Sequence, residues 1–420
     1  MSPLDEFLAE ATTAGPGPRR IPGCVLVAYK DGVLHDKSFG TKTLDPKSPH
    51  FGEPLSMDST MWIASLTKLM TAISVLQCVE KGLLNLDDDI STVLPEWKER
   101  ELLLRFDEAT GAPLLQKTEG KLSLRMLLTH SSGLCYPVLE PDFKRYLNYR
   151  TEQGWVMELM DLCPNEPVAL LFEPGTDWKY GFGTDWAGKM VERATGLRLN
   201  DYMDRHIWQP LGMTSTSFRL SSRPDIRARQ AELAVRSAAD GGSLAPFPTP
   251  YFPEATRDDH GGAGTYSCAR DYVKVLVACA TSDPRLLTAA GYDALCAPGL
   301  SEAAAARFRD VQGAVYAAGD AAAPELTGAP PAIPAPARES LSWAPGGMVV
   351  TQDAPGGRRA GSISWGGLPN LSWVVDRKSR TALLYASQLL PPGDVLTRLV
   401  VRWFEREVYD GEFFSKGASG

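Results

Sequence analysis

A serine and a lysine stand three residues apart in Ser65-Leu-Thr-Lys68, directly after the apolar segment 61–64. On a helix this spacing places both side chains on one face, close enough to interact. A serine hydroxyl is a poor nucleophile unless a neighbour takes its proton. A buried amine at a helix N-terminus can take that proton, because burial and the helix dipole both disfavour the charged form of the amine. The same N-terminus directs backbone N–H groups to where an oxyanion would develop. The motif therefore predicts acyl transfer through an ester on Ser65.

Two other interpretations of this motif stay open at the level of the residues. Ser65 would also serve as an ordinary helix cap, although glutamate rather than Lys68 is the residue favoured at the third helical position of such a cap. A Ser-His-Asp hydrolase is the natural rival, but it usually shows a G-x-S-x-G motif, and the sequence contains none. The spacing therefore favours a Ser-Lys nucleophile without proving it.

Regular elements are expected on both sides of the motif. A helix over residues 65–81, ended by Gly82, would carry the serine and the lysine. Asp31-Gly32 separates two β-rich runs and is typical of a hairpin turn. Residues 86–245 show helical and loop patterns, and strand-like runs return only late in the chain. The other expected elements are helices at 2–14, 121–130, 185–195 and 394–409 and strands at 362–365, 371–376 and 381–387.

This order of elements predicts an α/β (α+β) fold with two lobes. Residues 1–85 and 246–420 would form a discontinuous α/β lobe, and residues 86–245 an inserted all-α lobe. Active sites often lie between such lobes. Residues 303–337 are rich in alanine and proline, so we expect an irregular excursion there with no chemistry of its own.

Composition argues against several classes of protein. The 420 residues carry a net charge of −8, whereas nucleic-acid-binding proteins usually present a basic face. Apolar runs stay far below the ~20 residues that cross a bilayer, and the N-terminus shows no secretory signal. Seven widely spaced cysteines without a C-x-x-C pair fit a reducing compartment, so we expect a cytoplasmic protein. Five scattered histidines without H-E-x-x-H predict no metal site, and nothing indicates a cofactor.

Several blocks in order along the chain carry a resemblance to a known family. They read Ala64-Ser-Leu-Thr-Lys-Leu-Met-Thr-Ala72, Leu127-Leu-Thr-His-Ser-Ser-Gly-Leu134, Pro174-Gly-Thr-Asp-Trp-Lys-Tyr180 followed by the helix at 185–196, Gly261-Gly-Ala-Gly-Thr-Tyr-Ser-Cys-Ala-Arg-Asp271 and Trp365-Gly-Gly-Leu-Pro-Asn370. Together they resemble the serine β-lactamase and penicillin-binding-protein superfamily on its class C side. The nearest likeness is to family VIII carboxylesterases and to fungal polyketide acyltransferases of the lovastatin type. The resemblance spans nearly the whole chain and implies an antiparallel sheet flanked by helices plus the inserted helical lobe.

The resemblance also implies roles for individual residues. Ser65 would be the acylated nucleophile, and Lys68 would keep it deprotonated or relay its proton. Tyr180 would act as general base and then as proton donor to the leaving alcohol, with a nearby lysine cation stabilising its phenolate. The backbone amides of Ser65 and Leu368 would form the oxyanion hole. His130 lies within a block of the resemblance, and we expect it to brace a loop rather than act as a base.

Two motifs depart from the β-lactamase pattern. The second reads Tyr180-Gly-Phe182 and lacks the asparagine whose amide binds the antibiotic, and the third reads Trp365-Gly-Gly and lacks the lysine of K-T-G. Both departures remove polar partners for a charged β-lactam. We therefore expect a preference for an uncharged acyl group.

Several functions remain to be weighed for such a site. The leading hypothesis is a serine carboxylesterase for bulky, apolar esters of the secondary-metabolite type, and the alternative is an acyltransferase that takes its acyl group from a thioester or an acyl carrier. A β-lactamase and a non-catalytic binding module are lesser alternatives. The partner would be a small-molecule ester, with no nucleic acid and no membrane. The candidate substrate-binding residues are Tyr136, Phe182, Trp365, Gly366 and Gly367.

Overall fold

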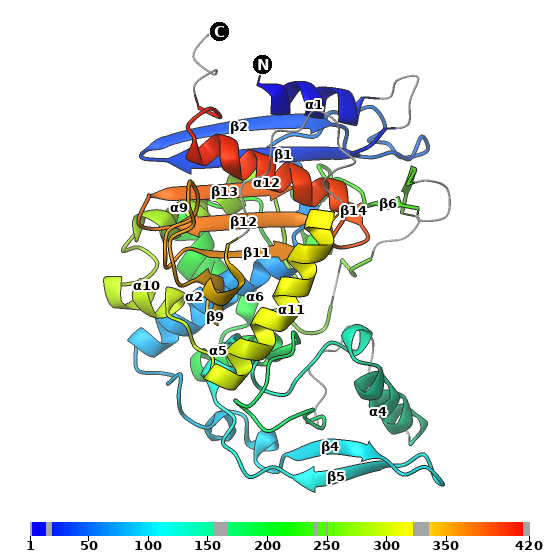
Figure 1. Cartoon of the computed structure of the whole chain (residues 1–420), viewed down its shortest axis with the longest axis vertical. Helices are drawn as coiled ribbons and strands as arrows, with labels where there is room; N and C mark the ends of the chain where they lie inside the picture. The colour runs from blue at the N-terminus through cyan, green and yellow to red at the C-terminus, as the bar shows by residue number, and fades with distance from the viewer. Residues whose placement is uncertain are drawn as a thin grey trace.

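The computed structural model describes residues 2–13, 19–153, 167–237, 242–247, 251–254, 256–321 and 336–414. A seven-stranded antiparallel sheet in the order β2-β1-β13-β12-β11-β10-β9 forms its centre (Figure 1). The strands are β1 (Gly23–Lys30), β2 (Val33–Gly40), β9 (Leu341–Ala344), β10 (Gly347–Val350), β11 (Ile363–Gly367), β12 (Leu371–Asp376) and β13 (Thr381–Ala386). Because β1 pairs with β13, the two ends of the chain build one sheet.

Both faces of this sheet are buried. Along β1, Val25 and Val27 belong to the larger apolar core, whereas Leu26 and Ala28 belong to a second core on the opposite face. Alternate side chains of a strand point to opposite faces, so an uninterrupted apolar run such as β1 requires cover on both sides. The sheet therefore needs helices in front of it and behind it.

Helices from distant parts of the chain supply this cover. In Figure 1, α12 (Val395–Tyr409) crosses in front of the sheet, and α2 (Thr67–Glu80) and α9 (Ala269–Thr281) lie behind it. The N-terminal helix α1 (Pro3–Thr12) begins with a capping box in which Ser2 and Asp5 bond each other's backbone amides. Behind the sheet α10 (Ala289–Cys296) packs on α2. No helix in the described ranges is both long enough and apolar enough to cross a bilayer.

The segment between the two halves of the sheet is mainly helical but not all-α, which corrects the sequence-based expectation. Its helices are α3 (Leu124–Leu128), α4 (Pro141–Glu152), α5 (Gly183–Thr195), α6 (Leu199–Met203), α7 (Gln209–Leu211) and α8 (Pro224–Arg227), with a π-helical turn η5 (Asp204–Trp208). It also carries the hairpin of β4 (Glu101–Phe106) and β5 (Pro113–Lys117), at the bottom of Figure 1. A turn from Asp107 to Gly111 separates two short leucine runs, and these runs are too short to show the period of a strand.

Short strands and single turns complete the fold. The strands are β3 (Met61–Trp62) paired with β8 (Tyr266–Ser267), and β6 (Ala234–Arg236), β7 (Leu244–Pro246) and β14 (Leu389–Leu390) in one small sheet. The 3-10 turns are η1 (Ala64–Leu66), η2 (Ile90–Thr92), η3 (Pro95–Trp97), η4 (Pro137–Leu139), η6 (Leu220–Ser222) and η8 (Arg338–Ser340). The pair β3–β8 is the one that flanks the nucleophile turn η1.

The alanine-rich stretch expected to be irregular begins as a long helix. α11 (Glu302–Ala321) packs on β9, with Phe308 buried against Trp178 and Trp343. Alanine is the strongest helix former, and the prolines of this stretch begin only at Pro324, so the helix contains no proline, although it includes Gly313 and Gly319. Residues 322–335 of the predicted excursion lie outside the described residues.

The cysteines within the described ranges are isolated thiols. Six are free and buried, at positions 24, 78, 135, 268, 279 and 296, and Cys163 lies outside the described residues. Burial raises the pKa of the Cys24 thiol to about 12, so this group stays protonated. These side chains pack as small apolar groups.

Candidate active site

Ser65 lies in the 3-10 turn η1, between β3 and the start of α2. The turn is held against β8 because Ile63 N–H donates to the Thr265 carbonyl and the hydroxyls of Thr67 and Thr265 lie 2.6 Å apart. Ala64, immediately before the serine, has a φ of +47°, a region that residues with a Cβ rarely adopt. Such strain persists only where the surrounding structure enforces it, and it is common at functional sites. The backbone therefore presents Ser65 on a tightly held turn just before α2, rather than at the first residue of the helix predicted over residues 65–81.

Lys68 and Tyr180 both reach the hydroxyl of Ser65. The Tyr180 Oη atom is hydrogen-bonded to Ser65 Oγ at 2.8 Å, and Lys68 Nζ donates to the same Oγ at 3.1 Å. Lys68 is on α2, one turn after the serine, whereas Tyr180 stands in the loop that leads into α5. The structure thus brings together the three groups that the sequence singled out, including one that is 115 residues away.

The ammonium group of Lys68 has three oxygen acceptors. Besides Ser65, it donates to Tyr136 Oη at 3.2 Å and to the Gly262 carbonyl at 2.8 Å, and the residue is 7% exposed. A lysine ammonium has three N–H donors and no acceptor, so this arrangement uses every donor. Its charge also lies 4.7 Å from the centre of the Tyr180 ring. The Nζ atom of Lys68 is thus held between Ser65, Tyr136 and the loop that carries Gly262.

Trp365 supplies a second hydrogen bond to Tyr180. Its indole Nε1–H donates to Tyr180 Oη at 2.9 Å, and the two ring centres lie 5.1 Å apart. Trp365 is on β11, in the position of the third motif. The oxygen of Tyr180 therefore contacts both the indole of Trp365 and the hydroxyl of Ser65.

His130 braces the segment that carries Tyr180. Its carbonyl accepts from Lys179 N–H, its Nδ1 accepts from Gly181 N–H at 3.4 Å, and its ring centre lies 4.5 Å from that of Tyr180. Burial, reinforced by the charge of Lys68, lowers the pKa of His130 well below its ordinary value. The imidazole is therefore neutral at pH 7 and holds both neighbours of Tyr180 in place.

The end of β11 approaches the nucleophile turn closely. A Cβ atom on Gly367 would lie 2.7 Å from the Ile63 carbonyl oxygen, and Leu368 packs against the small apolar cluster that contains Trp62 and Ala64. The Leu368 residue thus lies beside the turn that holds Ser65. Its amide remains the predicted partner of the Ser65 amide in an oxyanion hole.

The residues predicted to bind substrate lie in different parts of the structure. Phe182 is 5% exposed and packs beside Phe143 in the main core, and Tyr136 directs its hydroxyl to Lys68. A cavity of about 10 Å³ adjoins Ser65 and Lys68, with Trp343 and Trp365 among its other walls. That volume suits about one water molecule. A bulky acyl group therefore has to bind outside this cavity, and roles in substrate binding for Tyr136, Phe182, Trp365, Gly366 and Gly367 remain predictions.

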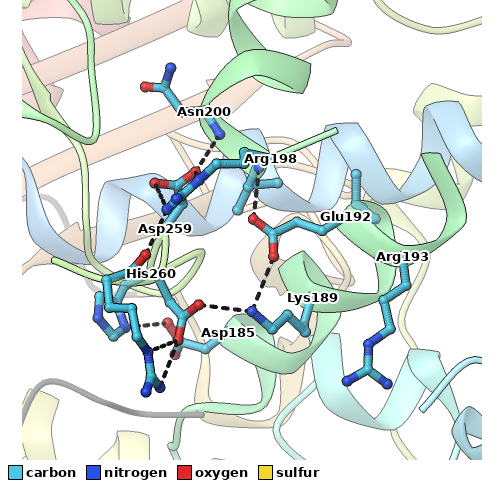
Figure 2. A network of polar contacts seen from close by, with 12 residues as sticks. Asp185, Lys189, Glu192, Arg193, Arg198, Asn200, Asp259 and His260 are labelled. Carbon is cyan, nitrogen blue, oxygen red and sulfur yellow. Dashed lines mark hydrogen bonds and ion pairs between the residues drawn. The ribbon is translucent and has the colours of Figure 1, made fainter. Parts of the chain in front are cut away.

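Sequence reasoning missed the groups behind Lys68. Gly262 N–H donates to Asp185 Oδ1 at 3.0 Å, and Figure 2 shows Asp185 beside His260 in a network of charged side chains. Asp185 stands in the first turn of α5, where an acidic residue is ordinary because it complements the helix dipole. Asp185 differs from a surface residue only in its burial, because it is 3% exposed. Burial cannot be read from one position in a sequence.

Comparisons with known proteins agree with this geometry. The chain is 34% identical over 397 residues to monacolin J acid methylbutanoyltransferase of Aspergillus terreus, covering 93% of this chain and 92% of that protein. It is 33% identical to lovastatin esterase of Penicillium rubens, covering 93% of this chain and 94% of that protein. A mutant simvastatin synthase (LovD) from Aspergillus terreus superposes with a TM-score of 0.84 at 33% identity, covering 98% of this chain and 94% of that chain. The Beta-lactamase family model matches residues 8–403, and the chain belongs to that family.

Proposed function

We propose that this protein is a serine acyl-transfer enzyme that carries its acyl group as an ester on Ser65. The observation that carries the proposal is the position of Ser65 Oγ, 2.8 Å from Tyr180 Oη and 3.1 Å from Lys68 Nζ. A nucleophile within hydrogen-bonding distance of its base is the arrangement that acyl transfer requires. The matched family and relatives that include both acyltransferases and an esterase support the same chemistry.

The proposed steps conserve protons at each stage. Ser65 Oγ attacks the carbonyl carbon of the donor while its proton passes to Tyr180 Oη, and the amides of Ser65 and Leu368 hold the oxyanion. Tyr180 then gives this proton to the departing alkoxide or thiolate, which leaves the acyl group on Ser65. In the second half the incoming water or alcohol loses its proton to Tyr180, which returns it to Ser65. Tyr180 therefore begins each half of the cycle as a phenolate, and Lys68 stays charged throughout and stabilises it.

Hydrolysis and transfer differ only in the second half of this cycle. We infer that the substrates are bulky, uncharged esters or thioesters of the polyketide type, because relatives with such names match at 33% to 34% identity. Ester hydrolysis is the first candidate. Transfer to an alcohol, from a thioester or an acyl carrier, is the second candidate, and the methylbutanoyltransferase relative supports it.

The site also supports the division into two lobes that we propose. Ser65, Lys68 and Trp365 belong to residues 1–85 and 246–420, whereas Tyr136 and Tyr180 belong to residues 86–245. The hydrogen bonds between these groups then run across the junction of the lobes.

The fate of the acyl group is testable with one set of incubations. The wild type and Ser65→Ala are given a short-chain p-nitrophenyl ester or an acyl thioester, with or without a bulky secondary alcohol, and products are separated by chromatography. We expect acyl-Ser65 in the intact mass of quenched wild type and near-background turnover in Ser65→Ala. Free acid alone indicates an esterase, and the ester of the added alcohol indicates a transferase. Undiminished turnover in Ser65→Ala contradicts the proposal.

The same assay tests the expected discrimination against β-lactams. Phe182 and Trp365 stand where the antibiotic-binding amide and cation occur in β-lactamases, so a penicillin lacks two polar partners here. We expect kcat/KM for benzylpenicillin to lie at least about a hundredfold below that for the p-nitrophenyl ester, since losing buried polar contacts costs several kcal/mol. Equal values for the two substrates would overturn this part of the proposal.

A further inference from the structure

A buried carboxylate lies directly behind the group that binds Lys68. Asp185 is 3% exposed, its Oδ1 accepts from Gly262 N–H at 3.0 Å, and the carbonyl of the same Gly262 accepts from Lys68 Nζ at 2.8 Å. One peptide segment thus connects the carboxylate to the ammonium. Figure 2 shows Asp185 directed toward His260, whose Nδ1 is 3.8 Å from Oδ1.

The second oxygen of Asp185 faces the other acceptor of Lys68. A Cβ atom on Gly262 would lie 2.5 Å from Asp185 Oδ2 and 3.2 Å from Tyr136 Oη, so the carboxylate and the phenol flank the same point. Among the described residues Oδ2 accepts no hydrogen bond. In the part of the chain that the structure describes, His260 is the one ion-pair neighbour of this carboxylate, and the charge of Asp185 also acts on the Lys68 ammonium.

We propose that Asp185 is a positioning residue that keeps Lys68 as an ammonium and directs it at Ser65 and Tyr180. It holds the Gly262 carbonyl toward Nζ, and it supplies the counter-charge that a buried cation needs. This inference rests on the proposed function, because Lys68 matters only where Ser65 is acylated. It assigns the proton acceptor to Tyr180 and excludes a neutral Lys68 as the base.

The loop that carries Gly262 has anchors of its own. Asp258 pairs with Lys189 at 2.9 Å, and Asp259 accepts from Arg198 and from the Asn200 amide (Figure 2). These contacts hold residues 257–260 on α5 and α6. Asp185 is therefore not required to fasten the loop, and a role through its charge is separable from a role in folding.

The charge of Asp185 disfavours folding, which is unusual for a residue kept only for structure. Burial raises the pKa of Asp185, although the nearby His260 and Lys68 offset part of this effect. Because the pKa is higher in the folded state than in the unfolded state, folding is favoured by protonation and loses that contribution as pH rises through the folded pKa. An uncharged group of the same shape avoids this cost.

The other titratable groups that face Asp185 and Lys68 are His130, Tyr136 and Tyr180.

The test compares Asp185→Asn with Asp259→Asn in the full-length enzyme. Asparagine keeps an oxygen for Gly262 N–H and removes the charge. We expect the melting temperature of Asp185→Asn to stay near that of wild type, because relief of the buried carboxylate offsets the loss of the counter-charge for Lys68. We expect its kcat/KM at pH 7 to fall about tenfold or more and the alkaline limb of its pH profile to lie about one unit lower. Asp259→Asn removes a carboxylate paired with arginines, so it should lower the melting temperature without moving either limb.

Each outcome of this comparison decides between a role of the Asp185 charge in catalysis and a role in folding alone. The inference is overturned if kcat/KM of Asp185→Asn lies within about twofold of wild type at every pH. It is also overturned if kcat/KM falls while both limbs of the pH profile stay where they are in wild type. Trapping the acyl group on Ser65 of wild type separates these results from failure of the proposed function, which would show no adduct at all.

Discussion

The oxygen of Tyr180 contacts two other side chains at this site. It lies 2.8 Å from Ser65 Oγ and accepts from Trp365 Nε1 at 2.9 Å. The indole of Trp365 is therefore a neutral donor to this oxygen. Lys68 is then the cation that contacts Ser65 among the described residues.

Replacing Trp365 by phenylalanine isolates this hydrogen bond. The ring and its packing on Tyr180 remain, but the phenolate loses its neutral donor, and hydrogen bonds to charged groups contribute about 1.5–3 kcal/mol. We expect kcat to fall about 10- to 100-fold while KM changes little, measured with a p-nitrophenyl ester. Trp208→Phe is the matched control because Trp208 is also buried and its indole N–H contacts Met70 Sδ rather than Ser65, Lys68 or Tyr180. A Trp365→Phe enzyme with wild-type kcat would refute the role of the indole.

At the scale of elements, the two glycines of the third motif meet different neighbours. A Cβ on Gly366 would lie 2.7 Å from the Leu371 carbonyl oxygen within its own hairpin, whereas one on Gly367 would lie 2.7 Å from the Ile63 carbonyl oxygen beside η1. Real Cβ atoms do not approach backbone oxygen so closely, so alanine at Gly367 has to push β11 away from the nucleophile turn. Both glycines are candidate substrate-binding residues from the sequence, and the structure adds a close approach of two protein elements at Gly367.

Gly367→Ala should therefore damage catalysis more than folding. Moving β11 displaces the amide of Leu368, and loss of one oxyanion donor typically costs about 100- to 1000-fold in kcat. The measurement is kcat with a p-nitrophenyl ester at a temperature well below the melting transition of the variant. Gly120→Ala is the control, since its nearest neighbour is the flexible end of Glu173 at 3.2 Å. Normal kcat in Gly367→Ala would place the oxyanion hole elsewhere.

At the scale of the whole molecule, a buried ion pair connects the sheet to its covering helix. Arg358 donates from Nε and from one terminal nitrogen to the carboxylate of Glu405 on α12, at 2.7 and 2.9 Å, and it also donates to Ser364 Oγ on β11. Both residues are less than 10% exposed. The contact joins the strand that carries Trp365 to the helix that closes the opposite face of the sheet.

Breaking this pair from one side should destabilise the whole fold. Arg358→Met leaves Glu405 buried without its main partner, and removing one partner of a buried pair typically costs about 3–5 kcal/mol. We expect a clearly lower urea midpoint, followed by circular dichroism, with kcat preserved at low temperature. The double variant Arg358→Met/Glu405→Leu should recover most of the loss because no charge is then buried alone. An unchanged midpoint in the single variant would show that the pair is dispensable.

Where neighbours in the sequence are also neighbours in space, the sequence predicted the structure closely. The expected strand at 371–376 is β12, the expected hairpin turn at Asp31-Gly32 joins β1 to β2, and the final helix begins one residue from its predicted start. The spacing of Ser65 and Lys68 likewise brought these two side chains together as expected. Periodicity and turn chemistry act over a few residues, so they can be read directly.

Other features depended on how distant segments pack. The β4–β5 hairpin and the helix α11 lacked a local pattern strong enough to identify them. The groups that bind Tyr180 and Lys68 come from distant parts of the sequence. Trp365 is 185 residues from Tyr180, and Gly262 is 194 residues from Lys68. By itself the sequence indicated the family of the fold and placed the Ser65 hydroxyl beside the Lys68 amine. Only the tertiary structure decided which oxygen and nitrogen atoms meet them, because contacts between segments so far apart are set by the burial of the whole core and not by local spacing.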